Sequence, residues 1–124
     1  MDIMDRINLM KECGLVDDAA YADLINIVRV FREDFQFEIT EENGGVMITH
    51  IGAAIHRQKT GEKVEPLDRE ILEQAGNDPV YWTAQKILER IRQTTPTRLP
   101  PEEEEFLLVH ICNTLQTGPD GSGQ

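Results

Sequence analysis

Apolar residues recur at intervals of three and four along most of the chain, the spacing that places side chains on one face of an α-helix. The longest such stripe runs over residues 17–35 and consists of Tyr21, Leu24, Val28, Phe31 and Phe35. Asp17 or Asp18 is suited to cap the start of this helix. The period-two alternation that marks β-strands is almost absent. The pattern therefore predicts an all-α fold.

Two shorter helices are predicted on either side of this one, over residues 3–13 and 46–59. Gly14 ends the first, as a residue that readily takes the left-handed conformation of a helix cap. The triplet Asn-Gly-Gly at 43–45 is expected to break the chain, so the second begins only after it and ends at Gly61. The stripe of the first helix consists of Ile3, Ile7 and Met10.

The second half of the chain predicts three more helices, each introduced by proline, which favours the first helical position. A small peripheral helix is expected over 66–75 and a longer one over 78–95, with Asp78 as its N-cap. The last is expected over 100–117, where Glu102, Glu103 and Glu104 occupy a first turn whose dipole favours carboxylates. The expected organisation is a short N-terminal helix in residues 1–16, a compact five-helix bundle in 17–117 and a flexible tail in 118–124.

The charge of the chain narrows its possible functions. Its 124 residues hold 23 acidic and 12 basic side chains, a formal net charge of −11. Such an excess of carboxylates repels phosphate backbones and anionic lipid, so direct binding of nucleic acid or a membrane surface is not expected. Uninterrupted apolar runs reach only four residues, and the N-terminus lacks a signal-peptide pattern. We expect a cytoplasmic protein.

Enzyme and metal-site motifs are not found. The sequence holds no Walker loop, no GxGxxG after a strand and no GxSxG, so neither catalysis nor a cofactor is expected. Cys13 and Cys112 stand in apolar contexts without CxxC spacing. They are interpreted as reduced, packed thiols rather than as a disulfide or zinc ligands.

Two histidines interrupt apolar helix faces. By helical spacing His50 shares a face with Arg57, and His110 shares one with Glu103. The small residues 52–54 beside His50 allow another helix to approach closely. His56 points away from His50 and is expected at the surface. We predict that His50 and His110, 60 residues apart, lie near a common edge of the bundle.

Three interpretations of this histidine pair remain open from the residues alone. The two imidazoles are hydrogen-bonded core groups, or metal ligands, or nucleophiles that accept a regulatory modification. The metal interpretation is the weakest, because neither helix offers a second ligand three or four residues from its histidine.

Two segments around these histidines resemble the motifs of a known family. The segment 48–57, ITHIGAAIHR, followed by Gly61-Glu62, is similar to the first histidine motif of the phosphotransferase-system regulation domain, or PRD. The segment 99–113, LPPEEEEFLLVHICN, is similar to the second. They stand in the family's order, and the resemblance extends over roughly residues 17–115.

The resemblance implies a five-helix all-α bundle with a regulatory function. Family members usually occur in tandem in bacterial transcriptional antiterminators and activators. Their histidines accept phosphate from phosphotransferase-system proteins such as HPr or enzyme II components, which shifts a dimer interface. This chain has one copy, and residues 1–16 are too few for a nucleic-acid-binding domain. The resemblance therefore implies a stand-alone module that acts through a partner protein. A helical interaction or scaffold domain without phosphorylation is the alternative.

The resemblance also implies roles for individual residues. His50 and His110 are the expected phosphoacceptors, with His50 preferred because Arg57 on its face is placed to pair with a phosphate. Arg57 is equally open to interpretation as a solvated cation at the helix end. Glu103 is expected either to orient His110 or to favour the helix start, and Asn113 to support the phosphate site.

A homodimer is expected for two reasons. The family uses dimer interfaces as its switching element, and the stripe of the extra helix over 3–13 needs a cover. Docking of that helix on its own domain is the alternative.

Overall fold

A computed structural model describes residues 1–117, which form six α-helices and no strand. This confirms the all-α prediction, whereas the expected tail at 118–124 lies outside the described residues. The helices are α1 (Ile3–Glu12), α2 (Asp18–Phe35), α3 (Glu41–Thr60), α4 (Arg69–Gly76), α5 (Tyr81–Thr94) and α6 (Pro101–Gln116). No helix within residues 1–117 combines the length and apolarity that a membrane span requires.

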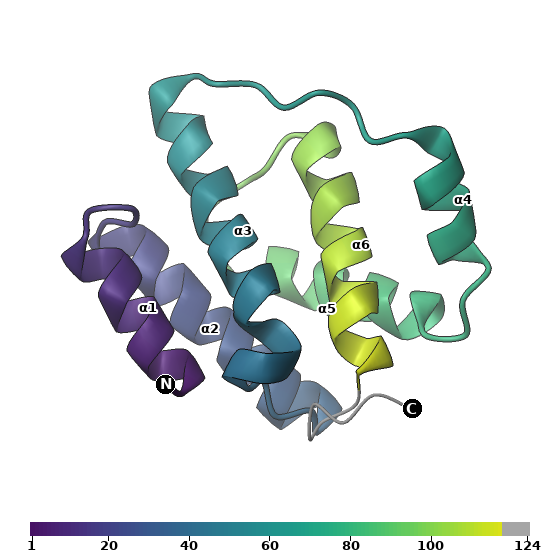
Figure 1. Ribbon diagram of the computed structural model, residues 1–124, viewed down its shortest axis with the longest axis horizontal. Coiled ribbons are helices and arrows are strands. Elements are labelled where there is room, and N and C mark those ends of the chain that lie inside the picture. Colours follow the sequence, from purple (N-terminus) through teal and green to yellow (C-terminus); the bar gives the residue numbers. More distant parts are fainter. Residues whose placement is uncertain (118–124) are drawn as a thin grey trace.

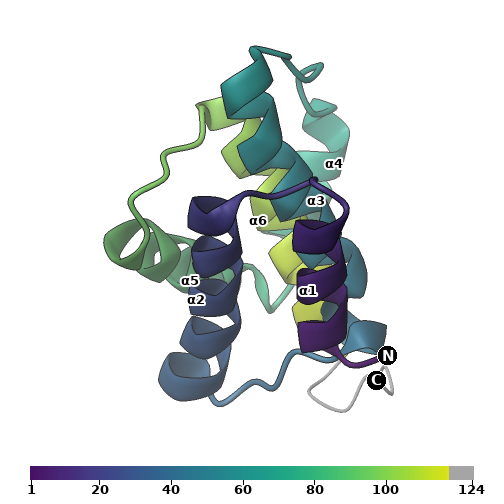
Figure 2. The ribbon, with the colours of Figure 1, turned by 90° about the vertical axis from the view of Figure 1, so that its left-hand side faces the viewer.

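Helix α3 lies at the centre of the bundle (Figure 1). It packs against α1 and α2 on one side and against α6 on the other, and α5 joins α2 to α6 across the back. Figure 2 shows α1 and α2 side by side, with α4 at the far edge of the molecule. Among the helices, α4 packs chiefly against α6. The periphery predicted for the short helix is thus confirmed.

Five of the six helices supply the core. Ile7, Phe31, Ile48, Ile87 and Ile111, one each from α1, α2, α3, α5 and α6, are fully buried. No residue of α4 is buried. Burial of the apolar stripes is the main stabilising contribution, at roughly 1.5–3 kcal/mol for each large side chain.

The extra helix α1 docks on its own domain. Its stripe residues Ile3, Ile7 and Met10 are buried, so the need for an external cover, one of the two reasons for expecting a dimer, does not hold. Gly52 of α3 makes this docking possible, because a Cβ there would collide with the Cε of Met10 and approach Val16 to 3.2 Å. Gly14, with a φ of 83°, ends this helix region in the left-handed conformation as predicted.

The start of α3 corrects the sequence prediction. The helix begins at Glu41, not after the Asn-Gly-Gly triplet, because Thr40 and Asn43 form a capping box. The Thr40 hydroxyl accepts from the Asn43 N–H at 3.1 Å, and the Asn43 side chain accepts from the Thr40 N–H at 2.8 Å. Gly44 then lies inside the helix, where the chain before it passes so closely that a Cβ would stand 2.5 Å from Ile39 Cγ2.

Two other helices, in contrast, start later than predicted. Helix α4 begins at Arg69, because Asp68 caps it by accepting from the Glu70 N–H at 2.9 Å. Helix α5 begins at Tyr81. Asp78 caps a preceding turn instead, accepting from the Val80 N–H at 2.9 Å.

The two cysteines differ in their surroundings. Cys112 is buried, as expected of a packed thiol, and burial with the nearby charge of Asp78 raises its pKa to about 11. Cys13 is exposed, so the prediction of a packed thiol is wrong there. Cys13 is the C-cap of α1, and the apolar residues that enter the core on either side of it are Met10 and Val16.

Replacing Gly44 by alanine is expected to lower the free energy of unfolding by about 1 kcal/mol. Alanine gains about 1 kcal/mol in helix propensity, but the collision with the β-branched Ile39 costs more, within about 1–3 kcal/mol for overpacking. Gly76→Ala is the matched control, because a Cβ at Gly76 meets no atom within 4 Å. Urea unfolding of both variants measures the difference, and equal stabilisation by both would contradict the packing account of Gly44.

Candidate functional site

Helices α3 and α6 run antiparallel, and two pairs of side chains make contact between them. Each of these pairs is called a rung below. His50 meets His110, and Arg57 meets Glu103, each seven residues further along in opposite directions. Seven residues are nearly two helical turns, so both rungs lie on the same face of the pair. The face shared by His50 and Arg57, and that shared by His110 and Glu103, were predicted from spacing. Their pairing across the interface is a result of the fold.

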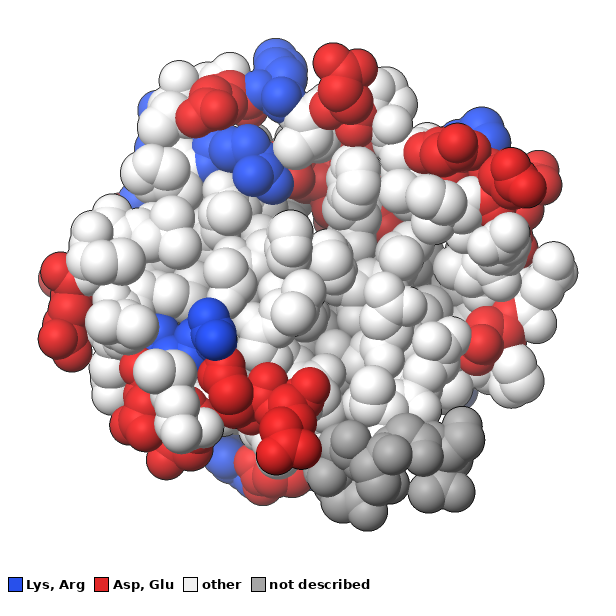
Figure 3. Space-filling view, in the orientation of Figure 1, with Lys and Arg blue, Asp and Glu red and all other residues white. Residues whose placement is uncertain are grey.

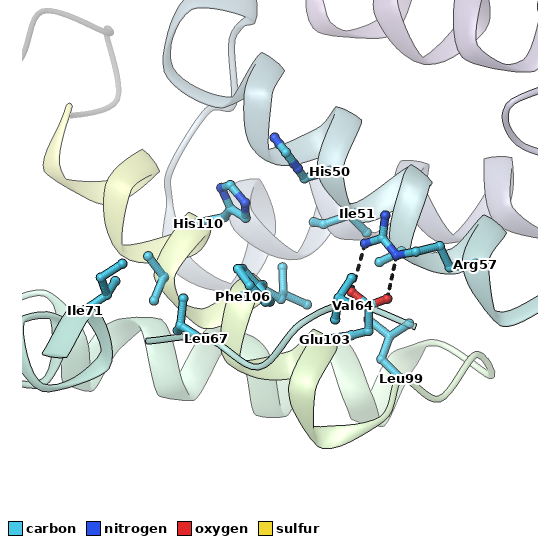
Figure 4. A pocket seen from close by; sticks show the side chains of 13 residues that line it. His50, Ile51, Arg57, Val64, Leu67, Ile71, Leu99, Glu103, Phe106 and His110 are labelled. Atoms are coloured by element: carbon cyan, nitrogen blue, oxygen red, sulfur yellow. Dashed lines mark hydrogen bonds and ion pairs between the residues drawn. The ribbon is translucent and has the colours of Figure 1, made fainter. Parts of the chain in front are cut away.

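The first rung is a stack of two imidazole rings. The ring centroids of His50 and His110 are 4.5 Å apart, with an angle of 22° between the planes. His50 is exposed and His110 is half-buried. Figure 4 shows both rings at one end of a pocket between the two helices. This confirms the prediction that the two histidines meet at one edge of the bundle.

Neither imidazole is tied to another side chain by a hydrogen bond within residues 1–117. Because His50 is exposed and His110 only half-buried, the interpretation of the pair as core histidines is wrong. Burial, and to a lesser extent the charge of His50, lowers the pKa of His110 below its ordinary value of 6.5. His110 is therefore held neutral at pH 7, with one ring nitrogen carrying a free lone pair.

The second rung is a bidentate ion pair. Arg57 donates from Nε and Nη2 to the two carboxylate oxygens of Glu103 at 2.8 and 2.9 Å (Figure 4). Glu103 is only 3% exposed, and Gln58 Nε2 approaches it at 3.5 Å. These hydrogen bonds raise the pKa of Arg57 above its already high value. Such a fork-to-fork geometry is the strongest form of carboxylate pairing.

The ion pair corrects two interpretations of single residues. Arg57 is not a solvated cation at the helix end, since its side chain is 24% exposed and closed on Glu103. Glu103 lies in the first turn of α6 as predicted, but its carboxylate orients Arg57 and not His110. A buried carboxylate requires a counter-charge, and the sequence did not show which cation would supply it.

Two further residues complete the comparison with the sequence. Asn113 is exposed, one turn beyond His110 on α6. His56 points away from the stack, as predicted, but is half-buried. It lines a separate pocket with residues 14–17 and Lys59.

No three metal-binding side chains gather anywhere in residues 1–117.

Between and beside the two rungs lies a cavity of about 450 Å³. Its walls come from α3 and α6, and its cover comes from the segment 61–68 and α4. The two rungs supply its polar residues, and the apolar lining consists of Ile51, Ala54, Val64, Leu67, Ile71, Leu99, Phe106, Leu107 and Val109. The sequence reasoning missed this cavity, because the segment 61–68 has no periodicity that would assign its Val64 and Leu67 to a neighbour.

The surface around the site carries few charges. Figure 3 shows a broad area without acidic or basic side chains over α3 and α6, with the charged groups gathered around its rim. In a chain with a net charge of −11 this is a local exception. The site therefore presents an uncharged face to an approaching molecule.

The family comparison assigns this arrangement to a class of protein. The family model of the PRD domain matches residues 25–114, and the chain belongs to that family. The histidine pair and the ion pair both fall inside the matched range. The chain is also similar to an uncharacterised Escherichia coli (strain K12) protein, YhfY, with 26% identity over 106 residues that cover 86% of this chain and 88% of the relative. No solved structure matches the chain significantly.

Removal of Arg57 is expected to destabilise the protein even without any modification. Arg57→Ala leaves the buried Glu103 carboxylate without its two charge-assisted hydrogen bonds, which costs about 1–3 kcal/mol. Arg57→Ala with Glu103→Leu removes the orphaned charge and is expected to recover most of this loss. Chemical unfolding of the single and double variants tests the coupling. If the losses in free energy of unfolding caused by the two substitutions simply add up in the double variant, the ion pair contributes nothing to stability.

The lowered pKa of His110 predicts an acid-sensitive contribution to stability. Between the folded pKa and the ordinary value of 6.5, the unfolded chain binds more protons than the native state. The free energy of unfolding is therefore fully retained above about pH 7.5 and falls as the pH drops through 6.5.

Imidazole NMR titration is expected to place the pKa of His110 below 6.5. His50→Gln removes the smaller of the two causes and should raise that pKa part of the way. His110→Gln should flatten the fall in stability between pH 7.5 and 5.5 relative to the unmodified protein. A His110 pKa at or above 6.5 would contradict the burial argument.

Proposed function

We propose that this PRD domain is a regulatory module whose stacked histidines accept a phosphoryl group from a phosphotransferase-system protein. The observation that carries the proposal is the His50–His110 stack, with both rings free of hydrogen bonds to described residues at the edge of an uncharged face. The family match, which includes both residues, supports it.

His50 is the preferred acceptor because it is exposed, whereas His110 is half-buried. In the transfer, the lone pair of a neutral imidazole nitrogen forms a bond to phosphorus while the bond from phosphorus to the donor breaks. The donor side chain leaves with its electron pair. HPr or an enzyme II component supplies the phosphoryl group in this proposal, and the uncharged face accommodates the donor.

The modification changes the charge at the helix interface. By analogy with other phosphorylated side chains, the group brings about −1.5 to −2 charges at neutral pH. Such a charge beside the half-buried ring of His110 cannot remain unpaired. Arg57 is the nearest cation on the same helix face, nearly two turns away, but it is closed on Glu103. Recruitment of Arg57 to the phosphate would orphan a buried carboxylate, so we propose that α3 and α6 shift relative to one another.

The proposed output is a change in protein association. A shift between α3 and α6 alters the uncharged face, where a partner protein or a second copy of the chain binds. We propose a cytoplasmic homodimer, with Asn113 supporting the phosphate from its exposed position on α6. In the alternative, the same face serves as a plain helical interaction surface that never receives phosphate.

Incubation with enzyme I, HPr and phosphoenolpyruvate tests the proposal. One phosphoryl group is expected to appear by intact mass measurement at neutral or alkaline pH, since phosphohistidine is lost in acid. His50→Ala should remove most of the label and His50→Ala with His110→Ala should remove it all. His56→Ala is the matched control and should label fully.

Two results would contradict the proposal. A protein that stays unlabelled by a verified donor mixture, including enzyme II components, would favour the plain interaction domain. Labelling confined to His56 would place the chemistry outside the stacked pair. Light scattering before and after labelling measures association. If labelling leaves the molar mass in solution unchanged, both for the protein alone and for its mixture with a partner, the proposed change in association is contradicted.

A further inference from the structure

We infer that the cavity between α3 and α6 is a binding site for an uncharged, mostly apolar small molecule whose one hydrogen-bonding group reaches the imidazoles of His50 and His110. Binding itself does not depend on the proposed phosphorylation. Its regulatory consequence, that an occupied cavity hinders phosphoryl transfer, rests on the proposed function.

The size and lining of the cavity define the body of the ligand. A volume of about 450 Å³ lies within the range of small-molecule pockets. Nine of the thirteen lining residues are apolar, and the aromatic ring of Phe106 and the side chain of Ile51 border the middle of the space (Figure 4). Apolar lining of this kind favours a ligand of two or three linked or fused rings over a sugar or nucleotide.

The polar residues define the rest of the ligand. The guanidinium of Arg57 is already closed on the buried carboxylate of Glu103, so this rung has no net charge to offer. An anion would have to lie near Glu103 in a chain of net charge −11, and a cation would lack a free carboxylate. The two imidazoles, which have no hydrogen bond to a described residue, are the groups left to bind a ligand N–H or O–H.

The side of the cavity covered by the segment 61–68 and α4 is the expected route of entry for a ligand. Val64 and Leu67 of the segment 61–68 and Ile71 of α4 close one side. No residue of α4 is buried, and an exposed ion pair between Arg69 and Glu105 links it to α6. Exposed ion pairs contribute little to stability, and of these three cover residues only Leu67 is buried, so we expect the cover to open at a smaller cost in free energy than the core.

N-phenyl-1-naphthylamine is a suitable fluorescent probe, because it has an uncharged aromatic body and one N–H donor. Saturable binding with one site per chain is expected. Its sulfonated analogue, 8-anilinonaphthalene-1-sulfonate, has the same skeleton with an added negative charge. The analogue is expected to bind at least tenfold more weakly, and equal affinity would overturn the assignment to an uncharged ligand.

Two matched substitutions locate the site. Val109 lines the cavity, so Val109→Phe fills part of it and should weaken probe binding at least tenfold. Val46 is 67% exposed on α3 and lies outside the cavity lining, so Val46→Phe should leave the affinity unchanged. Equal effects of the two variants, or no saturable binding to the unmodified protein, would overturn the proposal.

Imidazole NMR of the unmodified protein provides a test that does not depend on the folding of any variant. The probe should shift the resonances of His50 and His110 and leave those of His56, which lines another pocket, in place. A shift of His56 alone, or of none of the three, would overturn the assigned site.

The regulatory consequence is measured separately, as the rate of phosphoryl transfer with and without saturating probe. A rate lowered at least threefold supports it, and an unchanged rate overturns that consequence while leaving the binding site in place. If the protein is not labelled even without the probe, the proposed function fails. The fluorescence and NMR results do not depend on labelling and still test the binding site.

Discussion

The buried carboxylate of Glu103 fixes how α3 and α6 meet. A carboxylate that is 3% exposed needs a cation, and the planar guanidinium of Arg57 must face it squarely to make both hydrogen bonds. If α6 were shifted by one helical turn along α3, the ion pair would break and the charge of Glu103 would remain unpaired in the interior. The register that satisfies Glu103 also brings His110 against His50, nearly two turns away. The histidine stack is thus positioned by an ion pair in which neither histidine takes part.

Helix content could be read from the chain because periodicity and capping are local properties. The stripe that ends at Phe35 and the cap at Asp17 appear in the structure as expected. The triplet at 43–45 does not break the helix, although glycine is a poor helix former in isolation, because the close passage of Ile39 requires a glycine at position 44. Intrinsic preference is overruled by packing at such positions.

The site was only partly predictable, for the same reason. Helical spacing placed His50 and Arg57 on one face and His110 and Glu103 on another. Spacing within a helix contains no information on the register between two helices, so the partner of Glu103 remained undetermined. The cavity was beyond sequence reasoning, since Val64 lies in a segment without regular structure and reaches the site only through the path of the connection.

The close contact at Gly52 gives α3 two mechanically different sides. On the side of α1, the missing Cβ lets Met10 pack directly against the helix, and interlocked surfaces of this kind resist sliding. On the side of α6, the helix meets the stacked ring of His110, a partly open cavity and the Arg57–Glu103 ion pair that sets the register of the two helices. A change of charge at His50 therefore acts first on the contact with α6, because the ring of His110 lies against it with centroids 4.5 Å apart. The contact with α1, set by the close fit of Met10 and Val16 at Gly52, lies on the other side of α3.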